Sequence, residues 1–228
     1  MQSPNERARL SIVMLGATGA VGSEVVRALL SDPSLEQLTL LGRRSLEGVQ
    51  DDRITQHRID IFDPASYQRY VHGHHCAICT LGVGQPSKMD KAEFLQIDKH
   101  AVQNFAALCS EAGIEHFQLL SSVGANARSR SFYLRSKGEL QDGIRALGFK
   151  RLSVFQPSMI LTETNRYGFL QAATLALWPI VSHFLPGPLR KYRGIHVAQL
   201  GNAIAMNVRH PGSRFEILQW PEFVSLTK

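Results

Sequence analysis

A tyrosine and a lysine stand four residues apart in the segment FYLRSK, as Tyr133 and Lys137. On a helix this spacing places both side chains on one face. A phenol with a pKa of about 10 is a poor acid–base group at neutral pH, but an ammonium group one helical turn away stabilises the phenolate and brings that pKa toward the working range. The pair therefore predicts proton transfer. Ser121 and Ser122, which follow an apolar run, could donate a hydrogen bond to a carbonyl oxygen.

Three glycines at a spacing of three follow the first apolar run, in the segment LGATGAVG. A strand, a glycine turn and a helix N-terminus form an anion site, because unpaired amides and the positive end of the helix dipole face the ligand. Glycine also lets a pyrophosphate approach the backbone and lets the helix pack closely on its strand. The spacing departs from G-x-G-x-x-G, so a purely structural turn is the alternative. The expected contacts are Gly16, Thr18, Gly19, Ala20, Val21 and Gly22.

Two arginines follow the second apolar run, where a dinucleotide-binding protein usually has an acid. The segment LTLLGRRS places Arg43 and Arg44 about 27 residues beyond Gly16. An acid there would bind the ribose 2′-hydroxyl of NAD, whereas guanidinium groups suit a 2′-phosphate. We therefore expect NADP(H), against the alternative of a solvated arginine pair. Two further pairs complete the expected contacts: Asp60 and Ile61 beside the adenine, and Leu81 and Gly82 on the ribose or nicotinamide side.

Short apolar runs alternate with helical patterns along most of the chain. Strands are expected at 11–15, 37–41, 54–60, 76–81, 116–120, 151–155 and 214–218, and helices at 23–30, 64–71, 88–112 and 137–147. This alternation predicts an α/β fold with a doubly wound parallel sheet, the NAD(P)-binding Rossmann fold. We expect a single domain over 1–228, with a dinucleotide-binding core over 10–160 and a small substrate-side extension over 161–228.

In order and wording, five segments resemble a known superfamily: LGATGAVG, GRR, LLSS, YLRSK and FQPSMIL. They are similar to the short-chain dehydrogenases/reductases, in the extended or atypical branch, and more narrowly to oxidoreductases of the HTATIP2/TIP30 type. The resemblance implies NADPH and a catalytic triad in which Tyr133 donates the proton, Lys137 lowers its pKa and binds the nicotinamide ribose, and Ser122 orients the substrate oxygen. Ser121 is the alternative to Ser122. The resemblance also implies nicotinamide contacts from Pro157, Met159 and Ile160, and a closing helix from Ile195.

The expected function is an NADPH-dependent oxidoreductase, a carbonyl reductase or alcohol dehydrogenase acting on a small carbonyl or alcohol substrate. The apolar stretch 168–185 indicates an apolar substrate. Two departures from the family pattern favour the alternative of a non-catalytic NADPH-binding regulatory or sensor protein: the serine-to-tyrosine gap is only 11 or 12 residues, and the asparagine of typical members has no clear match, with Asp98 near its place. A semialdehyde-dehydrogenase-like enzyme is a second alternative, because GATGAVG also opens such enzymes.

Composition and charge limit the other function classes. The chain has 44% hydrophobic and 19% charged residues, typical of a soluble globular protein, and a net charge of +6 without a basic block, so no nucleic-acid partner is expected. Cys76 and Cys79 fall on opposite faces of an expected strand, and HGHHC precedes that strand in a turn, so no metal site is expected. The three cysteines, the polar N-terminus and the polar residues that interrupt 168–185 predict a cytoplasmic protein without a membrane span, as a monomer or homodimer.

Overall fold

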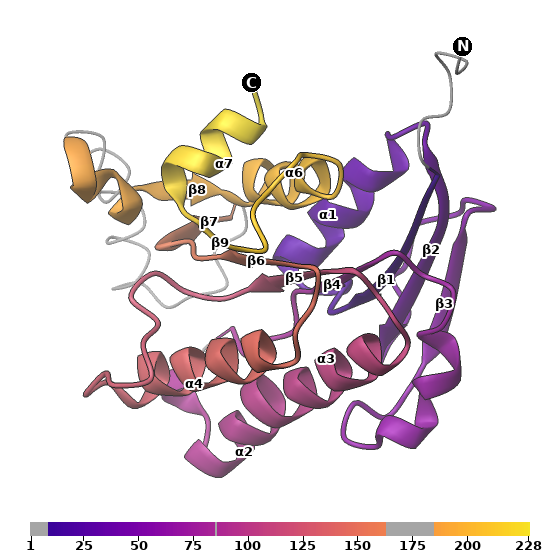
Figure 1. Ribbon diagram of the computed structural model, residues 1–228, viewed down its shortest axis with the longest axis horizontal. Coiled ribbons are helices and arrows are strands. Elements are labelled where there is room, and N and C mark those ends of the chain that lie inside the picture. The colour runs from indigo at the N-terminus through magenta and orange to yellow at the C-terminus, as the bar shows by residue number, and fades with distance from the viewer. Residues whose placement is uncertain (1–8, 85, 163–184) are drawn as a thin grey trace.

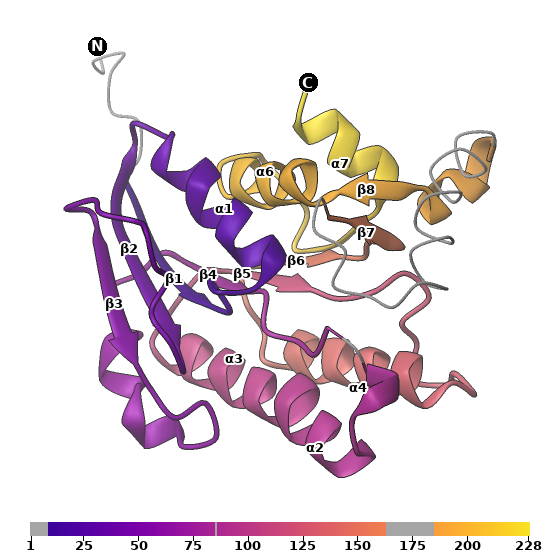
Figure 2. The same ribbon diagram turned by 180° about the vertical axis from the view of Figure 1, so that it is seen from behind.

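The centre of the molecule is a sheet of seven parallel strands (Figures 1 and 2). The computed structural model describes residues 9–84, 86–162 and 185–228. The strand order is β3-β2-β1-β4-β5-β6-β9, which reverses direction between β1 and β4. The doubly wound Rossmann architecture is confirmed. The strands are β1 (Leu10–Leu15), β2 (Leu35–Gly42), β3 (Ile54–Arg58), β4 (Cys76–Cys79), β5 (His116–Leu120), β6 (Arg151–Phe155) and β9 (Phe215–Leu218).

Helices cover both faces of this sheet (Figure 1). One face carries α1 (Ala20–Leu30), α6 (Val197–Asn207) and α7 (Trp220–Leu226), and the other carries α2 (Lys91–Leu95), α3 (Val102–Glu111) and α4 (Phe132–Ala146). Each face buries its own apolar cluster, because successive strand residues point to opposite sides. Cys76 belongs to one cluster and Cys79 to the other. The prediction that these two thiols face apart is confirmed.

The strands expected at 116–120 and 151–155 match β5 and β6 residue for residue. Other helices and strands begin or end at residues different from those expected. The helix expected at 88–112 begins at Lys91, because the Asp90 carboxylate accepts a hydrogen bond of 2.8 Å from the amide of Ala92 and caps it. It is also interrupted by a π-helical segment, η4 (Gln96–Ala101). The helix expected at 64–71 is instead two short 3₁₀ turns, Pro64–Ser66 and Gln68–Tyr70.

The last part of the chain contains elements that the sequence pattern does not predict. In a second, two-stranded parallel sheet, β7 (Met159–Leu161) pairs with β8 (Gly194–His196). A 3₁₀ segment, η5 (Gly187–Tyr192), comes just before β8. The expected closing helix corresponds to α6, which packs on α1. Of the apolar stretch 168–185, all but the last residue lies outside the described residues. Within the described ranges no helix is long and apolar enough to cross a membrane.

Candidate functional site

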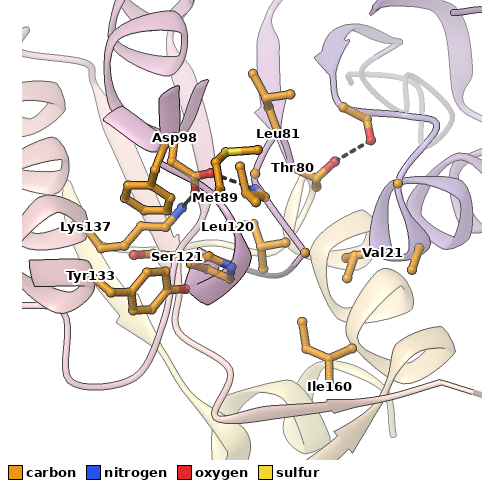
Figure 3. A pocket seen from close by; sticks show the side chains of 18 of the residues that line it. Val21, Thr80, Leu81, Met89, Asp98, Leu120, Ser121, Tyr133, Lys137 and Ile160 are labelled. Carbon is orange, nitrogen blue, oxygen red and sulfur yellow. Dashed lines mark hydrogen bonds and ion pairs between the residues drawn. The ribbon is translucent and has the colours of Figure 1, made fainter. Parts of the chain in front are cut away.

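A cavity of about 1100 Å³ opens at the carboxyl ends of β1, β4 and β5, where the strand order reverses. This is the usual position of a ligand in an open α/β sheet. Its walls come from the turn after β1, the end of β2, the loop after β4, the start of α4 and β7 (Figure 3). Many of the residues expected from the sequence line it: Gly16, Thr18, Gly19, Ala20, Val21, Arg43, Arg44, Leu81, Gly82, Tyr133, Lys137 and Ile160.

Six other expected residues are not among the lining residues: Gly22, Asp60, Ile61, Ser122, Pro157 and Met159. The side chain of Ile61 is 1% exposed and belongs to the apolar core. The Asp60 carboxylate accepts a hydrogen bond of 2.9 Å from the amide of Phe62. A Cβ at Gly22 would lie 2.1 Å from the Gly16 carbonyl oxygen, so Gly22 serves the close packing of α1 on the turn.

Pro157 and Met159 have structural partners beside the cavity. The Pro157 carbonyl accepts a hydrogen bond of 3.0 Å from the amide of Val123. Met159 pairs with Gly194 in the small sheet, and the next residue, Ile160, is the one that lines the cavity. Of the three residues expected to contact the nicotinamide, Pro157, Met159 and Ile160, Ile160 alone is therefore among the residues that line the cavity.

The glycine turn after β1 leaves its backbone open to the cavity. Gly16 has φ of 98°, and a Cβ there would lie 2.5 Å from the amide nitrogen of Leu81. The Thr80 hydroxyl donates a hydrogen bond of 3.0 Å to the Gly16 carbonyl and fixes the turn against the end of β4. A Cβ at Gly19 would meet only the Gly16 carbonyl oxygen within 4 Å, at 3.4 Å. Gly19 is also the N-cap of α1 and makes no side-chain capping bond.

This turn fits a diphosphate. The amides of the first turn of α1 have no capping side chain, so their N–H groups are available to an anion at the positive end of the helix dipole. The missing side chain at Gly19 provides the close approach that a phosphate needs. The residues of the turn can therefore hold the diphosphate of a dinucleotide.

Arg43 and Arg44 both line the cavity, and both are exposed. Neither side chain makes a hydrogen bond or ion pair with a residue that the structure describes. The lining residues contain one carboxylate, Asp98, which is paired with Lys137 and does not lie at the end of β2. Two guanidinium groups, unpaired within the described part of the chain, therefore lie on the cavity wall just after β2.

The start of α4 brings the expected acid–base pair to the cavity. The helix begins at Phe132, earlier than expected, so Tyr133 and Lys137 share its first turns. In Figure 3 both side chains lie on the wall opposite Val21. The Tyr133 ring packs on Phe94 with ring centroids 5.8 Å apart, and its hydroxyl makes no hydrogen bond with any residue in the described part of the chain. The hydroxyl is therefore available to a ligand.

Lys137 is only 5% exposed and keeps its charge. Its Nζ lies 2.6 Å from Oδ1 of Asp98. Burial by itself lowers the pKa of Lys137, but the negative charge and hydrogen bond of Asp98, together with the nearby Tyr133, outweigh it and raise that pKa above its usual value. Lys137 is therefore an ammonium at neutral pH.

Of the two adjacent serines, the structure brings Ser121 rather than Ser122 to the cavity wall. The Ser121 hydroxyl accepts a hydrogen bond of 2.6 Å from Nε2 of Gln141, so its own proton is free to be donated. Gln141 is held in turn by Gln156, whose Nε2 donates to the Gln141 Oε1 at 3.2 Å. Within the described residues, the Ser122 hydroxyl has one hydrogen-bond partner, the carbonyl of Val123 at 3.5 Å. The geometry thus favours the alternative serine.

The sequence reasoning missed part of the cavity wall. Thr80 was not expected to fix the glycine turn, and the apolar side chains of Met89, Phe94 and Phe132 were not expected among the lining residues. Asp98 was noted only for its position in the chain. A signal for it did exist: an acidic residue on the apolar face of its helix, four residues after the buried Phe94 and four before the buried Val102. A buried carboxylate of this kind needs a charged or hydrogen-bonding partner.

The cysteines are buried away from the cavity, and the described histidines do not gather with them. All three cysteines are free and buried, and none lines the cavity. Burial raises the pKa of both Cys76 and Cys79 to about 12, so neither is a thiolate at neutral pH. Among the described residues no three metal-ligating side chains gather in one place. The thiol chemistry of a semialdehyde-dehydrogenase-like enzyme therefore has no candidate nucleophile here.

Comparison with known proteins identifies the family. A family model described as NAD(P)H-binding matches residues 16–153. The chain belongs to this NAD(P)H-binding family. Protein HTATIP2 of Rattus norvegicus is 30% identical to this family member over 223 residues, covering 96% of this chain and 89% of that protein. Protein FMP52-1, mitochondrial, of Scheffersomyces stipitis is 29% identical over 197 residues, covering 86% and 82%. The expected resemblance to HTATIP2 is confirmed, whereas a cytoplasmic location stays a prediction.

Solved structures of NAD complexes share the fold of this family member. MoeE5 in complex with UDP-glucuronic acid and NAD superposes with a TM-score of 0.69 at 16% identity, covering 94% of this chain and 80% of MoeE5. The UDP-glucose 4-epimerase of Thermus thermophilus, in complex with NAD, gives a TM-score of 0.69 at 13% identity, covering 96% and 82%. At these identities the likeness shows the Rossmann fold alone.

Proposed function

We propose that this chain is an NADPH-dependent oxidoreductase that interconverts a carbonyl and an alcohol. One observation carries the proposal: Tyr133, whose hydroxyl has no hydrogen-bond partner among the described residues, and the buried, charged Lys137 lie on the cavity wall opposite Val21 of the turn (Figure 3). When bound, the nicotinamide supplies or accepts the hydride. The chain's own residues supply the proton and orient the substrate oxygen.

Tyr133 is the proposed acid–base group. In reduction its hydroxyl gives a proton to the carbonyl oxygen, and in oxidation it takes the proton back. The ammonium of Lys137 stabilises the phenolate that forms in reduction. Ser121 donates the second hydrogen bond to the same oxygen, because Gln141 already donates to its hydroxyl and leaves its proton free.

Arg43 and Arg44 are the proposed reason for a preference for NADP(H) over NAD(H). Both guanidinium groups are exposed and unpaired within the described residues, and the one carboxylate among the cavity-lining residues, that of Asp98, is paired with Lys137. Planar guanidinium groups bind phosphate through paired hydrogen bonds. The diphosphate would lie on the amides of the turn from Gly16 to Val21.

The proposed substrate is a small carbonyl or alcohol compound with an apolar body. Met89, Phe94, Phe132 and Ile160 line the same cavity as Tyr133, and the Phe94 ring packs against the rings of Phe132 and Tyr133. Such walls bind apolar groups, while a few polar side chains fix the orientation. An aromatic or aliphatic aldehyde or ketone fits this chemistry.

The test is turnover by the Tyr133→Phe variant, measured as NADPH consumption with a panel of aliphatic and aromatic aldehydes and ketones. We expect kcat to fall at least about 100-fold, the scale of general acid catalysis, while NADPH affinity stays unchanged. Tyr70→Phe is the matched control, because Tyr70 stacks on His57 with ring centroids 3.6 Å apart and does not line the cavity. A fully active Tyr133→Phe enzyme contradicts the mechanism. Wild-type protein that binds NADPH but reduces no carbonyl supports the regulatory alternative instead.

A further inference from the structure

A buried carboxylate, that of Asp98, contacts two separate parts of the cavity wall. Its Oδ1 lies 2.6 Å from Nζ of Lys137, and its Oδ2 accepts a hydrogen bond of 2.6 Å from the amide of Val83. The two charged side chains are only 2% and 6% exposed. Asp98 therefore joins α4 to the loop that follows β4, and Figure 3 shows it above Lys137 on the cavity wall.

The contacts of Asp98 require a carboxylate. Both of its neighbours, the ammonium of Lys137 and the backbone amide of Val83, are hydrogen-bond donors. A carboxylate has an acceptor oxygen for each, whereas an asparagine side chain has one acceptor and one donor group, and the donor would face one of these donors. A Cβ at Gly82 would lie 3.2 Å from the Asp98 Oδ1, so the loop backbone passes close over the ion pair.

The helix is distorted where it carries Asp98. The residue lies in the π-helical segment η4 (Gln96–Ala101), between α2 and α3. Such segments are rare and occur frequently at functional sites. The next residue, Lys99, pairs with Glu139 of α4 at 2.6 Å, with side chains 23% and 39% exposed. The same two elements are thus joined by one buried ion pair at the cavity and one at the surface.

Among the described residues, three ionisable groups act electrostatically on Lys137: Asp98 from η4, Tyr133 from its own helix and Cys79 from β4. Burial raises the pKa of Cys79 to about 12, so this thiol is uncharged at neutral pH. Asp98 is then the only anion that faces Lys137 within the described residues. Two opposite charges at this distance form a unit with no net charge, and its field falls off faster than that of a lone ammonium.

We propose that Asp98 is a positioning residue that fixes Lys137 against the loop after β4 and offsets its positive charge. Tyr133 then works beside a neutral ion pair rather than beside a lone ammonium. This inference rests on the proposed function. Its consequence is that loss of the Asp98 carboxylate leaves a lone ammonium beside Tyr133, which favours the phenolate over the hydroxyl that donates the proton in carbonyl reduction.

The test is a pH titration of the full chain labelled with ¹³C at the tyrosine ring carbon that bears the oxygen, followed by NMR in the absence of substrate. The Tyr133 signal is assigned by its loss in Tyr133→Phe. We expect Asp98→Asn to move the midpoint of the Tyr133 titration toward acid by about one pH unit, because it removes the anion and leaves the ammonium. The matched control, Glu139→Gln, breaks the surface pair between the same elements and should leave the midpoint unchanged. An unmoved midpoint in Asp98→Asn, or an equal shift in Glu139→Gln, overturns the proposal.

A double variant covers the case in which Asp98→Asn does not fold, since that variant leaves Lys137 buried without its partner. Asp98→Asn with Lys137→Gln replaces both charges by neutral amides. The proposal expects its midpoint to lie about one pH unit to the acid side of that of Lys137→Gln alone, because the single variant leaves the Asp98 anion near Tyr133 and the double variant removes it. Equal midpoints in the two variants overturn the proposal.

The same titration separates this inference from the proposed function. If Asp98→Asn moves the midpoint but the wild type reduces no carbonyl, the positioning role stands and the enzymatic proposal fails. If the wild type turns over and the midpoint does not move, the enzymatic proposal stands and the role of Asp98 fails. When both hold, the pH profile of kcat in Asp98→Asn shifts toward acid in parallel with the NMR midpoint.

Discussion

Replacing Gly19 by alanine is expected to impair dinucleotide binding and to leave the fold nearly as stable as that of the wild type. Gly19 has φ of −78° and ψ of 165°, a conformation open to any residue. The added Cβ would meet one atom, the Gly16 carbonyl oxygen at 3.4 Å, which is an ordinary contact. Alanine is a poorer N-cap than glycine, but it also reduces the freedom of the unfolded chain, so the two effects offset each other to within about 1 kcal/mol.

Gly16→Ala supplies the contrast within the same turn. Its φ of 98° is unfavourable for alanine, and the new Cβ would lie 2.5 Å from the Leu81 amide nitrogen and 2.6 Å from the Thr80 carbonyl carbon. Backbone strain of about 1–3 kcal/mol and overpacking of about 1–3 kcal/mol together lower the free energy of unfolding by roughly 2–6 kcal/mol. A loss of this size is a large part of the total stability of a typical domain.

Two assays separate these effects. Urea denaturation followed by circular dichroism measures the free energy of unfolding, and calorimetric titration measures NADPH affinity. The Gly19→Ala Cβ projects where a diphosphate must approach, so we expect affinity to fall by at least about tenfold, or about 1.4 kcal/mol. A Gly19→Ala protein that binds NADPH as tightly as the wild type, or that unfolds as readily as Gly16→Ala, would refute the assignment of this turn.

Three further predictions concern other residues. Arg43→Ala combined with Arg44→Ala should weaken NADPH binding at least about tenfold and NADH binding less than about twofold, because only the 2′-phosphate bonds are lost; equal losses in calorimetry would contradict this. Ser121→Ala should lower kcat by about 10- to 100-fold and Ser122→Ala by less than about threefold, and the reverse order would reinstate Ser122. Burial and the nearby Arg151 lower the pKa of His116 from 6.5 to about 3, so the unfolded chain takes up a proton that the folded chain does not as the pH falls below about 6.5. In urea denaturation, the free energy of unfolding of the wild type should therefore fall by about 2 kcal/mol more between about pH 6.5 and pH 5 than that of His116→Gln. Equal decreases in the two proteins would rule out His116 as the origin of acid sensitivity.

The central strands of the sheet, β1, β4, β5 and β6, could be predicted from the sequence because they are buried on both faces. β5 and β6 are short apolar runs bounded by polar residues, and their limits match the prediction. The start of α4 was placed too late because the preceding segment is rich in arginine and serine, while the helix is in fact capped by Ser131, whose hydroxyl accepts from the amide of Leu134. β7 and β8 are three residues each, too short for any periodicity to appear.

The choice between Ser121 and Ser122 lies beyond sequence spacing. Adjacent residues at a strand end point to opposite sides, so a difference of one residue decides which hydroxyl meets the cavity. Here the amide of Ser121 donates a hydrogen bond of 2.7 Å to the Phe155 carbonyl and continues the pairing of β5 with β6. This contact fixes the serine orientation, and it depends on how two separate segments align.

The ion pair of Asp98 and Lys137 was hidden for a different reason. The two residues lie 39 positions apart and meet only because η4 packs against α4. Local pattern could show that a carboxylate occupies an apolar helix face, but not which cation lies opposite. Partners of buried charges depend on how the helices pack and become visible only in three dimensions.

We propose that the glycine turn binds the diphosphate of a dinucleotide and that the two arginines bind its 2′-phosphate. Calorimetric titration of the wild-type chain with NADPH and, in parallel, with NADH tests it most directly. We predict one binding site per chain and an NADPH affinity at least about tenfold higher than that for NADH, the contribution of about 1.4 kcal/mol from the extra phosphate. Absence of binding with both nucleotides, or equal or tighter binding of NADH, would contradict the account.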